Sequence, residues 1–353
     1  MLAERDGRIT RHPATETAIV SKMRVAVIGV GRIGEMHARV LAADRAVDQL
    51  LVSDVDEERA RSVADGIGAT VAGSPEAAMD AADAVVIAAS TDSHAPLIHA
   101  AVDRGLPTFC EKPVALDLES TRAVVDHVER AGGVVQIGFQ RRFDAGYRAA
   151  KQALESGSLG MLYLVRLIAH DHAPPPDAYI PVSGGLFRDS SVHDFDSLRW
   201  FTGAEAIEVY AVGAVRGFEV FARHDDVDTA VATIRMSDGV LACLSQTRHD
   251  PRGYDIRMEA VGSGDSVAVG LSPRTPLAST EQDGSAMFPG PAWKGFLERF
   301  AEAYRLELQE FLHVARGEAP SPCTVHDGLE AMRMAVAAGR SLIEGRPVAL
   351  AEV

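Results

Sequence analysis

The stretch that decides the fold is Val25-Ala26-Val27-Ile28-Gly29-Val30-Gly31-Arg32-Ile33-Gly34, an apolar run that leads into three spaced glycines. Residues 35–41 follow with the pattern of a helix, and Asp54 closes the next apolar run twenty residues after Gly34. In a strand–turn–helix unit the first glycine permits a tight turn, the second lets a pyrophosphate approach the backbone, and the third lets the helix pack against the strand. The stretch therefore predicts a dinucleotide-binding Rossmann unit.

The acid at position 54 predicts which dinucleotide binds. A carboxylate there accepts hydrogen bonds from the ribose hydroxyls and repels a 2′-phosphate. No arginine follows it immediately, since Arg59 and Arg61 come later, in what reads as the next helix. We therefore expect NAD rather than NADP. The expected cofactor-binding residues of this region are Gly29, Gly31, Arg32, Ile33, Gly34 and Asp54.

Composition limits the class of protein. A chain of 353 residues can hold two domains, and its net charge of −15 argues against nucleic acid or an anionic membrane as a partner. Three widely spaced cysteines fit a reducing cytoplasm, and no apolar run approaches the roughly 20 residues of a membrane span. Residues 1–22 are polar and lack the apolar centre of a signal peptide, so we expect a mobile extension.

Residues 24–138 alternate between short apolar runs and helical patterns. Strands are expected at 25–28, 49–53, 84–89, 108–110 and 134–137, with helices at 33–43, 57–67, 96–104 and 118–131. Because apolar runs of this kind are buried on both faces, they indicate a parallel sheet. The alternation predicts a doubly wound α/β domain, which we place at residues 23–140.

The pattern changes after residue 140. A helix near 145–156 precedes longer strands, expected at 162–172, 207–215, 229–236, 240–247 and 254–261, and Ser237-Asp238-Gly239 marks a hairpin. Residues 271–292 read as a long loop, and helices are expected at 294–316 and 326–344. Strands joined by short turns suggest an antiparallel sheet, so residues 141–353 are predicted to form a second domain.

Cys110-Glu111-Lys112-Pro113 ends a predicted parallel strand, where open α/β sheets bind their ligands. Lysine is rare in this chain, with four lysines against thirty-one arginines (35 − 4). An ammonium at this edge can donate to a substrate hydroxyl, and the alternative is a surface lysine in a loop. The Lys112-Pro113 bond is a candidate cis peptide.

Asp189 and His193 are four residues apart at the start of a predicted helix, so we expect them to share a face. A carboxylate near an imidazole orients it and favours its protonated form, as a general base requires. The alternative is an N-cap aspartate with an unrelated histidine.

Arg141 begins the segment that leaves the first domain, while His170 and His172 are two apart on a predicted strand and so should point to the same face. Such donors suit a polyhydroxylated ligand at the cleft between domains. The alternative is a solvated arginine pair and a polar strand end.

Taken in order, these motifs resemble the glucose–fructose oxidoreductase/inositol dehydrogenase (Gfo/Idh/MocA) family. They are the glycine fingerprint, Thr91-Asp92-Ser93-His94, Glu111-Lys112-Pro113, Gly138-Phe139 with Arg141-Arg142, and Asp189 with His193. The resemblance spans roughly residues 23–350 and is strongest to the inositol 2-dehydrogenase branch.

The resemblance implies roles for these residues. Lys112, Asp189 and His193 would be catalytic: His193 removes a hydroxyl proton, Lys112 donates to the reacting oxygen, and Asp189 orients His193. Thr91, His94, Glu111 and Lys112 would border the cofactor. The substrate would meet Arg141, His170, His172, Tyr254 and Tyr304, although relatives are expected to carry asparagine near the place of His172. The fold that the resemblance implies is an N-terminal Rossmann domain and a C-terminal α/β domain with an open antiparallel sheet. In the family the exposed face of that sheet commonly packs against another subunit, which implies a dimer or tetramer.

The function expected from these features is NAD-dependent oxidation of a secondary hydroxyl of a cyclic polyol or sugar. Three alternatives remain open: an NAD-dependent glycosidase, an aldose dehydrogenase of the same family, or a non-catalytic NAD-linked regulator. No metal is expected, because the twelve histidines show no H-E-x-x-H or similar spacing.

Overall fold

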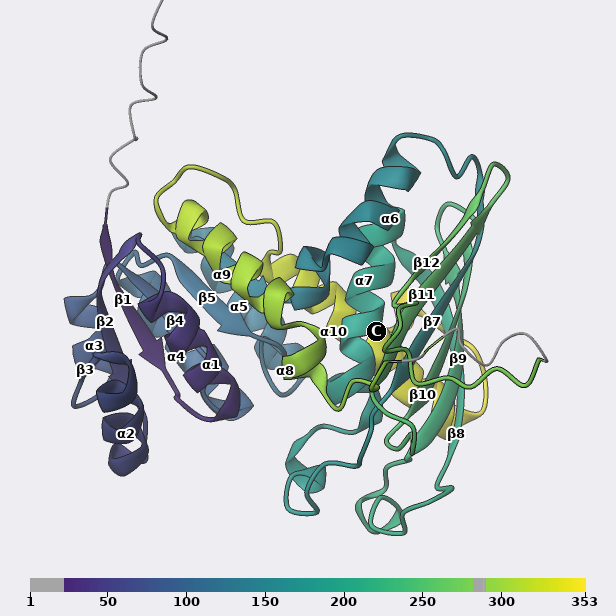
Figure 1. Cartoon of the computed structure of the whole chain (residues 1–353), viewed down its shortest axis with the longest axis horizontal. Coiled ribbons are helices and arrows are strands. Elements are labelled where there is room, and N and C mark those ends of the chain that lie inside the picture. Colours follow the sequence, from purple (N-terminus) through teal and green to yellow (C-terminus); the bar gives the residue numbers. More distant parts are fainter. Residues whose placement is uncertain (1–21, 282–287, 289) are drawn as a thin grey trace, which may run out of the picture.

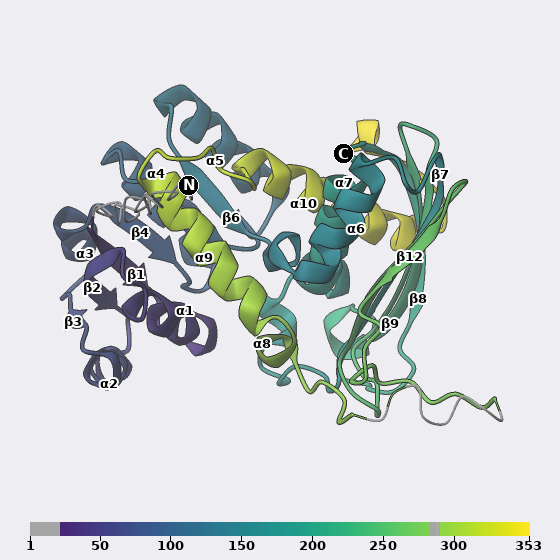
Figure 2. The same ribbon diagram turned by 45° about the horizontal axis from the view of Figure 1, so that its top comes forward.

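The structure is a computed structural model that describes residues 22–281, 288 and 290–353. The expected mobile extension lies outside these residues except for Lys22, and part of the expected loop at 271–292 also lies outside them. Two α/β units stand side by side, each with its own sheet (Figures 1 and 2).

The first unit is a six-stranded sheet in which every neighbouring pair is parallel, in the order β3-β2-β1-β4-β5-β6. This order, with a reversal between β1 and β4, is that of a dinucleotide-binding Rossmann sheet and confirms the prediction. Its strands are β1 (Met23–Ile28), β2 (Val47–Ser53), β3 (Thr70–Val71), β4 (Ala84–Ile87), β5 (Thr108–Glu111) and β6 (Val135–Gly138).

Five helices connect these strands and cover the sheet: α1 (Arg32–Ala42), α2 (Glu57–Ile67), α3 (Pro75–Ala81), α4 (Thr91–Asp103) and α5 (Leu118–Ala131). Aspartate caps fix two starts, since Asp56 accepts from the Arg59 N–H and Asp117 from the Ser120 N–H. The expected helix at 96–104 begins earlier, at Thr91, with Pro96 inside it. The segment at Thr91–His94 is therefore the first turn of a helix that starts beyond the carboxyl end of β4.

The second unit is a seven-stranded sheet in the order β12-β11-β7-β10-β9-β8-β13. Its strands are β7 (Leu162–His170), β8 (Ala206–Ala214), β9 (Thr229–Met236), β10 (Leu241–Thr247), β11 (Asp255–Gly262), β12 (Ser266–Val269) and β13 (Val348–Ala349). The sheet is mostly antiparallel, as predicted, and β9 and β10 form the predicted hairpin. The β7–β10 pair is parallel, so the sheet is mixed.

Three helices cover one face of this sheet, the face turned toward the first unit (Figures 1 and 2). They are α6 (Ala145–Glu155), α7 (Val192–Thr202) and α10 (Val325–Glu344). On the opposite face Tyr210, Val212, Val231 and Leu241 are exposed. Short 3₁₀ helices occur at Gln140–Phe143, Ile180–Val182, Ala222–His224 and Leu350–Glu352.

The last helices contact both units. The expected helix at 294–316 is broken at Phe300 into α8 (Phe296–Arg299) and α9 (Ala301–Ala315). Leu308, Phe311 and Leu312 of α9 pack into the core of the first unit, and α10 contacts both α5 and β8. Within the described part of the chain, no helix combines the length and the apolar character that crossing a bilayer demands.

Candidate active site

The glycine loop has the backbone that its sequence predicted. Gly29 has φ +84°, and a Cβ there would lie 2.5 Å from the backbone of Ala89, so a side chain is excluded. A Cβ on Gly34 would lie 1.9 Å from the Gly29 carbonyl oxygen, which confirms its role in close helix packing. A Cβ on Gly31 would meet nothing of the protein within 4 Å. The space beside Gly31 at the N-terminus of α1 therefore fits the approach of a pyrophosphate.

Asp54 is held at the end of β2 by the chain around it. Its carboxylate accepts hydrogen bonds from the Val30 N–H (2.7 Å) and the Asp56 N–H (2.9 Å), and its side chain is 5% exposed. The sequence predicted no arginine close to Asp54, and this prediction is wrong. The first turn of α2 brings Arg59 Nη1 to 3.4 Å from Asp54 Oδ1. That guanidinium is engaged by carboxylates rather than free for a 2′-phosphate.

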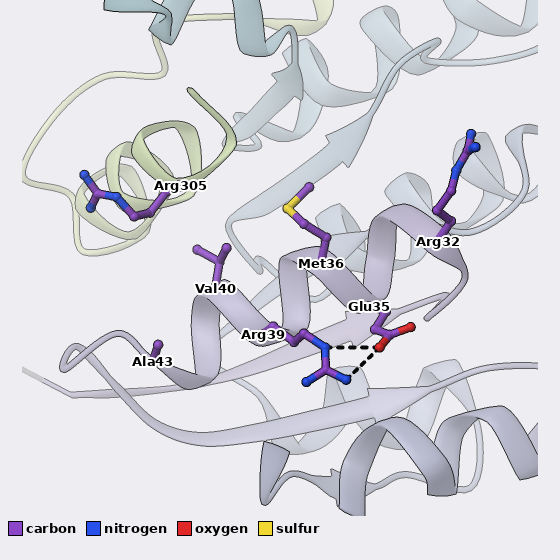
Figure 3. Close-up of a pocket in the computed structure, with 7 residues that line it drawn as sticks. All are labelled: Arg32, Glu35, Met36, Arg39, Val40, Ala43 and Arg305. Atoms are coloured by element: carbon purple, nitrogen blue, oxygen red, sulfur yellow. Dashed lines mark hydrogen bonds and ion pairs between the residues drawn. The ribbon is translucent and has the colours of Figure 1, made fainter. Parts of the chain in front are cut away.

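A hollow of about 500 Å³ lies between α1 and α9, and Arg32 is the one predicted site residue in its lining. Figure 3 shows its lining: Arg32, Glu35, Met36, Arg39, Val40, Ala43 and Arg305. Arg39 is paired with Glu35 at 2.7 Å. Arg32, from the glycine loop, places its guanidinium 4.9 Å from the ring centre of Phe296, so the loop and α8 are in contact.

Lys112 brings the two units together. It follows β5, the Lys112-Pro113 peptide is cis as expected, and its Nζ donates to the Asp189 carbonyl oxygen at 2.7 Å. The same Nζ lies 3.6 Å from Asp189 Oδ1, and the Lys112 side chain is only 18% exposed. Lys112 is therefore not a solvated surface lysine, and the structure brings it into contact with Asp189 of the second unit.

The carboxylate of Asp189 is surrounded by donors. Oδ1 accepts from the Tyr179 hydroxyl at 2.9 Å, and Oδ2 lies 2.9 Å from Arg248 Nη1. Burial opposes the ionisation of Asp189, but Lys112, Arg248 and Tyr179 together outweigh it and lower the pKa of this carboxyl. Asp189 is thus an ionised group at neutral pH.

The structure does not show the expected pairing of Asp189 with His193. No hydrogen bond joins them among the described residues, because Phe187–Ser191 forms a π-helical turn before α7 and the simple α-helical spacing does not hold. Among the described residues, His193 Nδ1 is buried and has no hydrogen-bond partner. The His193 ring stands edge-on to the Phe139 ring, with 5.8 Å between the ring centres.

The protonated form of His193 is also not the favoured one. Burial, then the charges of Lys112 and Arg141, hold the pKa of His193 well below its usual value of 6.5. The imidazole is therefore neutral at pH 7, which is the form that can accept a proton.

The arginine pair at 141–142 is buried rather than solvated. Arg141 is 3% exposed and donates from Nη1 to Asp194 Oδ1 at 2.5 Å. Arg142 binds Asp196 through two hydrogen bonds of 3.0 and 2.5 Å. Asp194 and Asp196 both project from α7, so this helix positions both arginines.

His170 and His172 meet at one aspartate instead of sharing a strand face. β7 ends at His170, and His172 lies two residues beyond the end of the strand. His170 Nδ1 lies 3.7 Å from Asp250 Oδ2, and His172 Nδ1 lies 3.3 Å from the Asp250 carbonyl oxygen. Burial lowers the pKa of His170 against the pull of Asp255 and Asp250.

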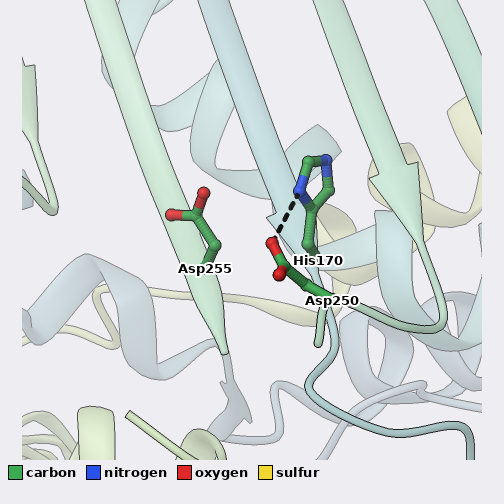
Figure 4. Close-up of side chains that lie close together, drawn as sticks. All are labelled: His170, Asp250 and Asp255. Carbon is green, nitrogen blue, oxygen red and sulfur yellow. Dashed lines mark ion pairs between the residues drawn. The ribbon is translucent and has the colours of Figure 1, made fainter. Parts of the chain in front are cut away.

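His170, Asp250 and Asp255 offer ligand atoms within 4.8 Å of one another (Figure 4). The Asp255 carboxylate already accepts from Arg257 Nε at 2.8 Å and from Arg257 Nη2 at 3.0 Å. A cation would have to compete with this guanidinium, which already neutralises the Asp255 carboxylate.

Three of the residues expected near the cofactor, His94, Glu111 and Thr91, differ in burial and in hydrogen-bond partners. His94 is buried, with Nδ1 2.7 Å from the Pro113 carbonyl oxygen and Nε2 3.1 Å from that of Ala89. Both ring nitrogens thus face protein carbonyls, so the structure gives the His94 side chain a role in fixing the chain after Lys112 rather than one toward the cofactor. Glu111 is buried against His37, whose Nε2 is 2.6 Å from Glu111 Oε1. Thr91 is partly exposed at the start of α4.

The two tyrosines lie near Arg141. Tyr254 and Tyr304 are 8% and 3% exposed. Burial raises the pKa of each hydroxyl, and the Arg141 guanidinium opposes that rise in both cases. The Tyr304 ring also contacts the His37 ring edge-on at 5.8 Å, so it belongs partly to the core of the first unit.

The sequence interpretation missed Tyr179, Asp171 and Arg248, which surround Asp189. Tyr179 lies in the proline-containing segment between β7 and α7, and Arg248 is one arginine among many. One signal was available: Arg248 directly follows a predicted strand, and Lys112 lies two residues after one.

The chain belongs to the Gfo/Idh/MocA oxidoreductase family. Residues 23–139 match the model of an oxidoreductase family with an NAD-binding Rossmann fold, and residues 147–268 match a GFO/IDH/MocA C-terminal domain. The chain is 39% identical over 333 residues to the myo-inositol dehydrogenase Hyg17 of Streptomyces leeuwenhoekii, with 93% of this chain and 100% of that protein covered.

Solved structures agree with the assignment to the family. A myo-inositol dehydrogenase from Corynebacterium glutamicum superposes with a TM-score of 0.86 at 35% identity, covering 93% of this chain and 99% of that one. A scyllo-inositol dehydrogenase from Lactobacillus casei with bound NAD(H) and scyllo-inositol gives 0.84 at 28% identity, covering 94% and 99%. The family, the NAD-binding Rossmann fold and the oxidoreductase class are thus those expected from the sequence.

Proposed function

We propose that this protein oxidises a secondary hydroxyl of an inositol-like cyclic polyol to a ketone, with NAD as the hydride acceptor. The observation that carries the proposal is the meeting of Lys112 from the first unit with Asp189 from the second, beside His193 and beyond the carboxyl ends of the parallel strands. The named inositol dehydrogenases among its relatives supply the substrate class.

The cofactor, when bound, supplies the two-electron acceptor for hydride. Gly29, Gly31, Arg32, Ile33 and Gly34 would hold its pyrophosphate, and Asp54 its adenosine ribose. Thr91, Glu111 and Lys112 would border its nicotinamide end.

His193 is the base in this proposal. Its Nδ1 is buried, which leaves Nε2 as the nitrogen open to a substrate, and the neutral ring can take the hydroxyl proton there. The ammonium of Lys112 donates to the reacting oxygen, and Asp189 holds that ammonium in place. Asp189 would therefore orient Lys112 and not His193, because its carboxylate faces Lys112.

Arg141, His170, His172, Tyr254 and Tyr304 would bind the remaining hydroxyls of the ring. Their donors and acceptors come from several directions around Arg141 and Asp250, as recognition of a ring with many hydroxyls requires. A histidine at position 172, where relatives are expected to carry asparagine, would change which isomer fits best.

The experiment is a screen of NAD reduction over inositol isomers and common aldoses, with the His193→Ala variant as control. We expect NADH with at least one inositol and its loss in the variant. NADH with aldoses alone would replace the polyol by a sugar. Release of aglycone from a glycoside without net NADH would favour the glycosidase alternative, and binding of NAD with no turnover of any substrate would favour the regulator.

We also propose the finer assignments that the family match leaves open. Residues 23–140 would bind the cofactor, and residues 141–353 would bind the substrate and form the oligomer. The exposed apolar face of the second sheet, with Tyr210, Val212, Val231 and Leu241, would pack against another copy in a dimer or tetramer. A cytoplasmic location fits the three free cysteines.

A further inference from the structure

Arg248 directly follows β10, and its side chain is only 4% exposed. Its Nη1 atom lies 2.9 Å from Asp189 Oδ2 and 3.5 Å from Asp171 Oδ2. Asp171 directly follows β7, and its N–H donates to the Thr247 carbonyl oxygen at 2.9 Å. Because β7 and β10 are parallel neighbours, Asp171 and Arg248 reach the same edge of the sheet, and that edge faces Lys112.

The guanidinium of Arg248 is poorly satisfied for a buried group. Among the described residues, its Nε and Nη2 are buried and have no hydrogen-bond partner. Buried donors without partners reduce stability, and native structures keep such groups mainly where function requires them. Packing alone therefore does not explain an arginine here.

Two carboxylates share the charge of Arg248, and Lys112 is the second cation that acts on both. Burial raises the pKa of Asp171 and the Asp189 charge adds to the rise, while Arg248 and Lys112 oppose it. The pKa of Asp189 stays low only because Lys112, Arg248 and the Tyr179 hydroxyl outweigh its burial. The groups that face the pair are thus Lys112, Tyr179 and Arg248, with Asp226 as a further charge near Arg248.

We propose that Arg248 is a positioning residue of this site: it holds the Asp189 carboxylate beside Lys112 and keeps Asp189 and Asp171 ionised side by side. Without it the two acids share a proton, since neighbouring like charges disfavour double ionisation. Lys112 then keeps its hydrogen bond to the Asp189 carbonyl oxygen but loses the carboxylate charge 3.6 Å from its Nζ, so the ammonium no longer meets the reacting oxygen in one geometry. The catalytic consequence rests on the proposed function.

The first test compares three variants in polyol oxidation. Arg248→Met removes the charge, Arg248→Lys keeps it, and Arg252→Met alters an exposed arginine four residues away as a matched control. We expect kcat of Arg248→Met to fall about 10²-fold with the KM for NAD unchanged, because misplacing a reacting group costs about this much. Arg248→Lys should recover part of the loss, and Arg252→Met should match the wild type.

The pH profile distinguishes charge from packing. In Arg248→Met the acid limb of kcat should move to higher pH, and adding Asp171→Asn in that background should move it back, because the competing carboxylate is gone. An acid limb that stays in place in Arg248→Met, or that does not return in the double variant, would overturn the proposal.

Thermal unfolding tests the same charges in a measurement that does not depend on enzyme activity. In Arg248→Met the unpaired acid would have a higher pKa in the folded protein than in the unfolded chain. The loss of unfolding free energy that it causes therefore grows as pH rises. The Tm deficit relative to wild type should therefore be larger near about pH 8 than near about pH 5, and Asp171→Asn should remove this difference. If Arg248→Met does not fold, the double variant is expected to fold; failure of both, or a deficit independent of pH, overturns the proposal. A wild type that oxidises no polyol would refute the proposed function and leave this thermal test standing.

Discussion

Replacing His193 with alanine removes the group proposed to take the hydroxyl proton. Burial and the charges of Lys112 and Arg141 hold the pKa of His193 well below 6.5, so at pH 7 nearly every molecule carries a neutral imidazole ready to act as a base. His193→Ala should then lose the whole contribution of general-base catalysis to turnover. Such catalysis supplies typically 10²- to 10⁴-fold, or about 2.7 to 5.5 kcal/mol of transition-state stabilisation, so kcat should fall by that factor.

The assay is steady-state NADH formation with an inositol across a range of pH. The wild type should keep its activity well below pH 6.5 before the acid limb appears, and this limb should vanish in the variant. NAD affinity, measured by direct binding, should be unchanged because His193 belongs to α7 in the second unit. Turnover of His193→Ala within about tenfold of wild type, or a wild-type acid limb at or above the ordinary histidine pKa, would refute the reasoning.

Four further outcomes are expected. Asp54→Ser should lower the ratio of kcat/KM for NAD over NADP at least about tenfold, since the nearby guanidinium is freed for a 2′-phosphate; an unchanged ratio contradicts the role of Asp54. Arg142→Met leaves Asp196 buried without its bidentate partner and should cost about 3 to 5 kcal/mol in urea unfolding; a loss below about 1 kcal/mol would argue against a paired buried charge. Burial lowers the pKa of His94, so the unfolded chain takes up this proton first and unfolding free energy should fall as pH drops below 6.5; His94→Gln should flatten that dependence, and an equally steep profile would count against it. Leu241→Asp, on the open sheet face, should reduce the oligomer mass measured by light scattering, and an unaltered mass would place the interface elsewhere.

The first unit could be predicted from the sequence because its strands are apolar runs buried on both faces and separated by amphipathic helices. The glycine loop is predictable for a stronger reason: Gly29 and Gly34 sit where any Cβ would collide with backbone. The missed elements are short or exposed. The two residues of β3 lie at the sheet edge and are both exposed, so no hydrophobic pattern marks them.

The second unit shows where local pattern fails. A single run suggested one helix over 294–316, but the backbone at Phe300 leaves the helical region with φ −112° and ψ 17°. The parallel β7–β10 pair is a long-range feature, since the hairpin signal between β9 and β10 says nothing about which strand lies on the far side of β10.

The site was predictable only in part, for a related reason. Lys112 could be placed because a strand end in a parallel sheet is a known ligand position. Arg248 could not, because its approach to Asp189 joins residues far apart in the chain. The expected contact of Asp189 with His193 failed because a π-helical turn replaced the assumed α-helix. Local spacing pointed to the groups that we propose as reacting groups, and tertiary packing decided which of them pair.

The most direct measurement of the central claim follows the hydrogen atom itself. An inositol deuterated at its ring carbons is incubated with the wild-type protein and NAD, and the nicotinamide of the product is analysed by mass spectrometry. We predict one deuterium on each NADH formed, together with a ketone in equal amount and a slower rate than with the unlabelled ring. Unlabelled NADH, or a labelled ring recovered intact after prolonged incubation with bound cofactor, would contradict the account.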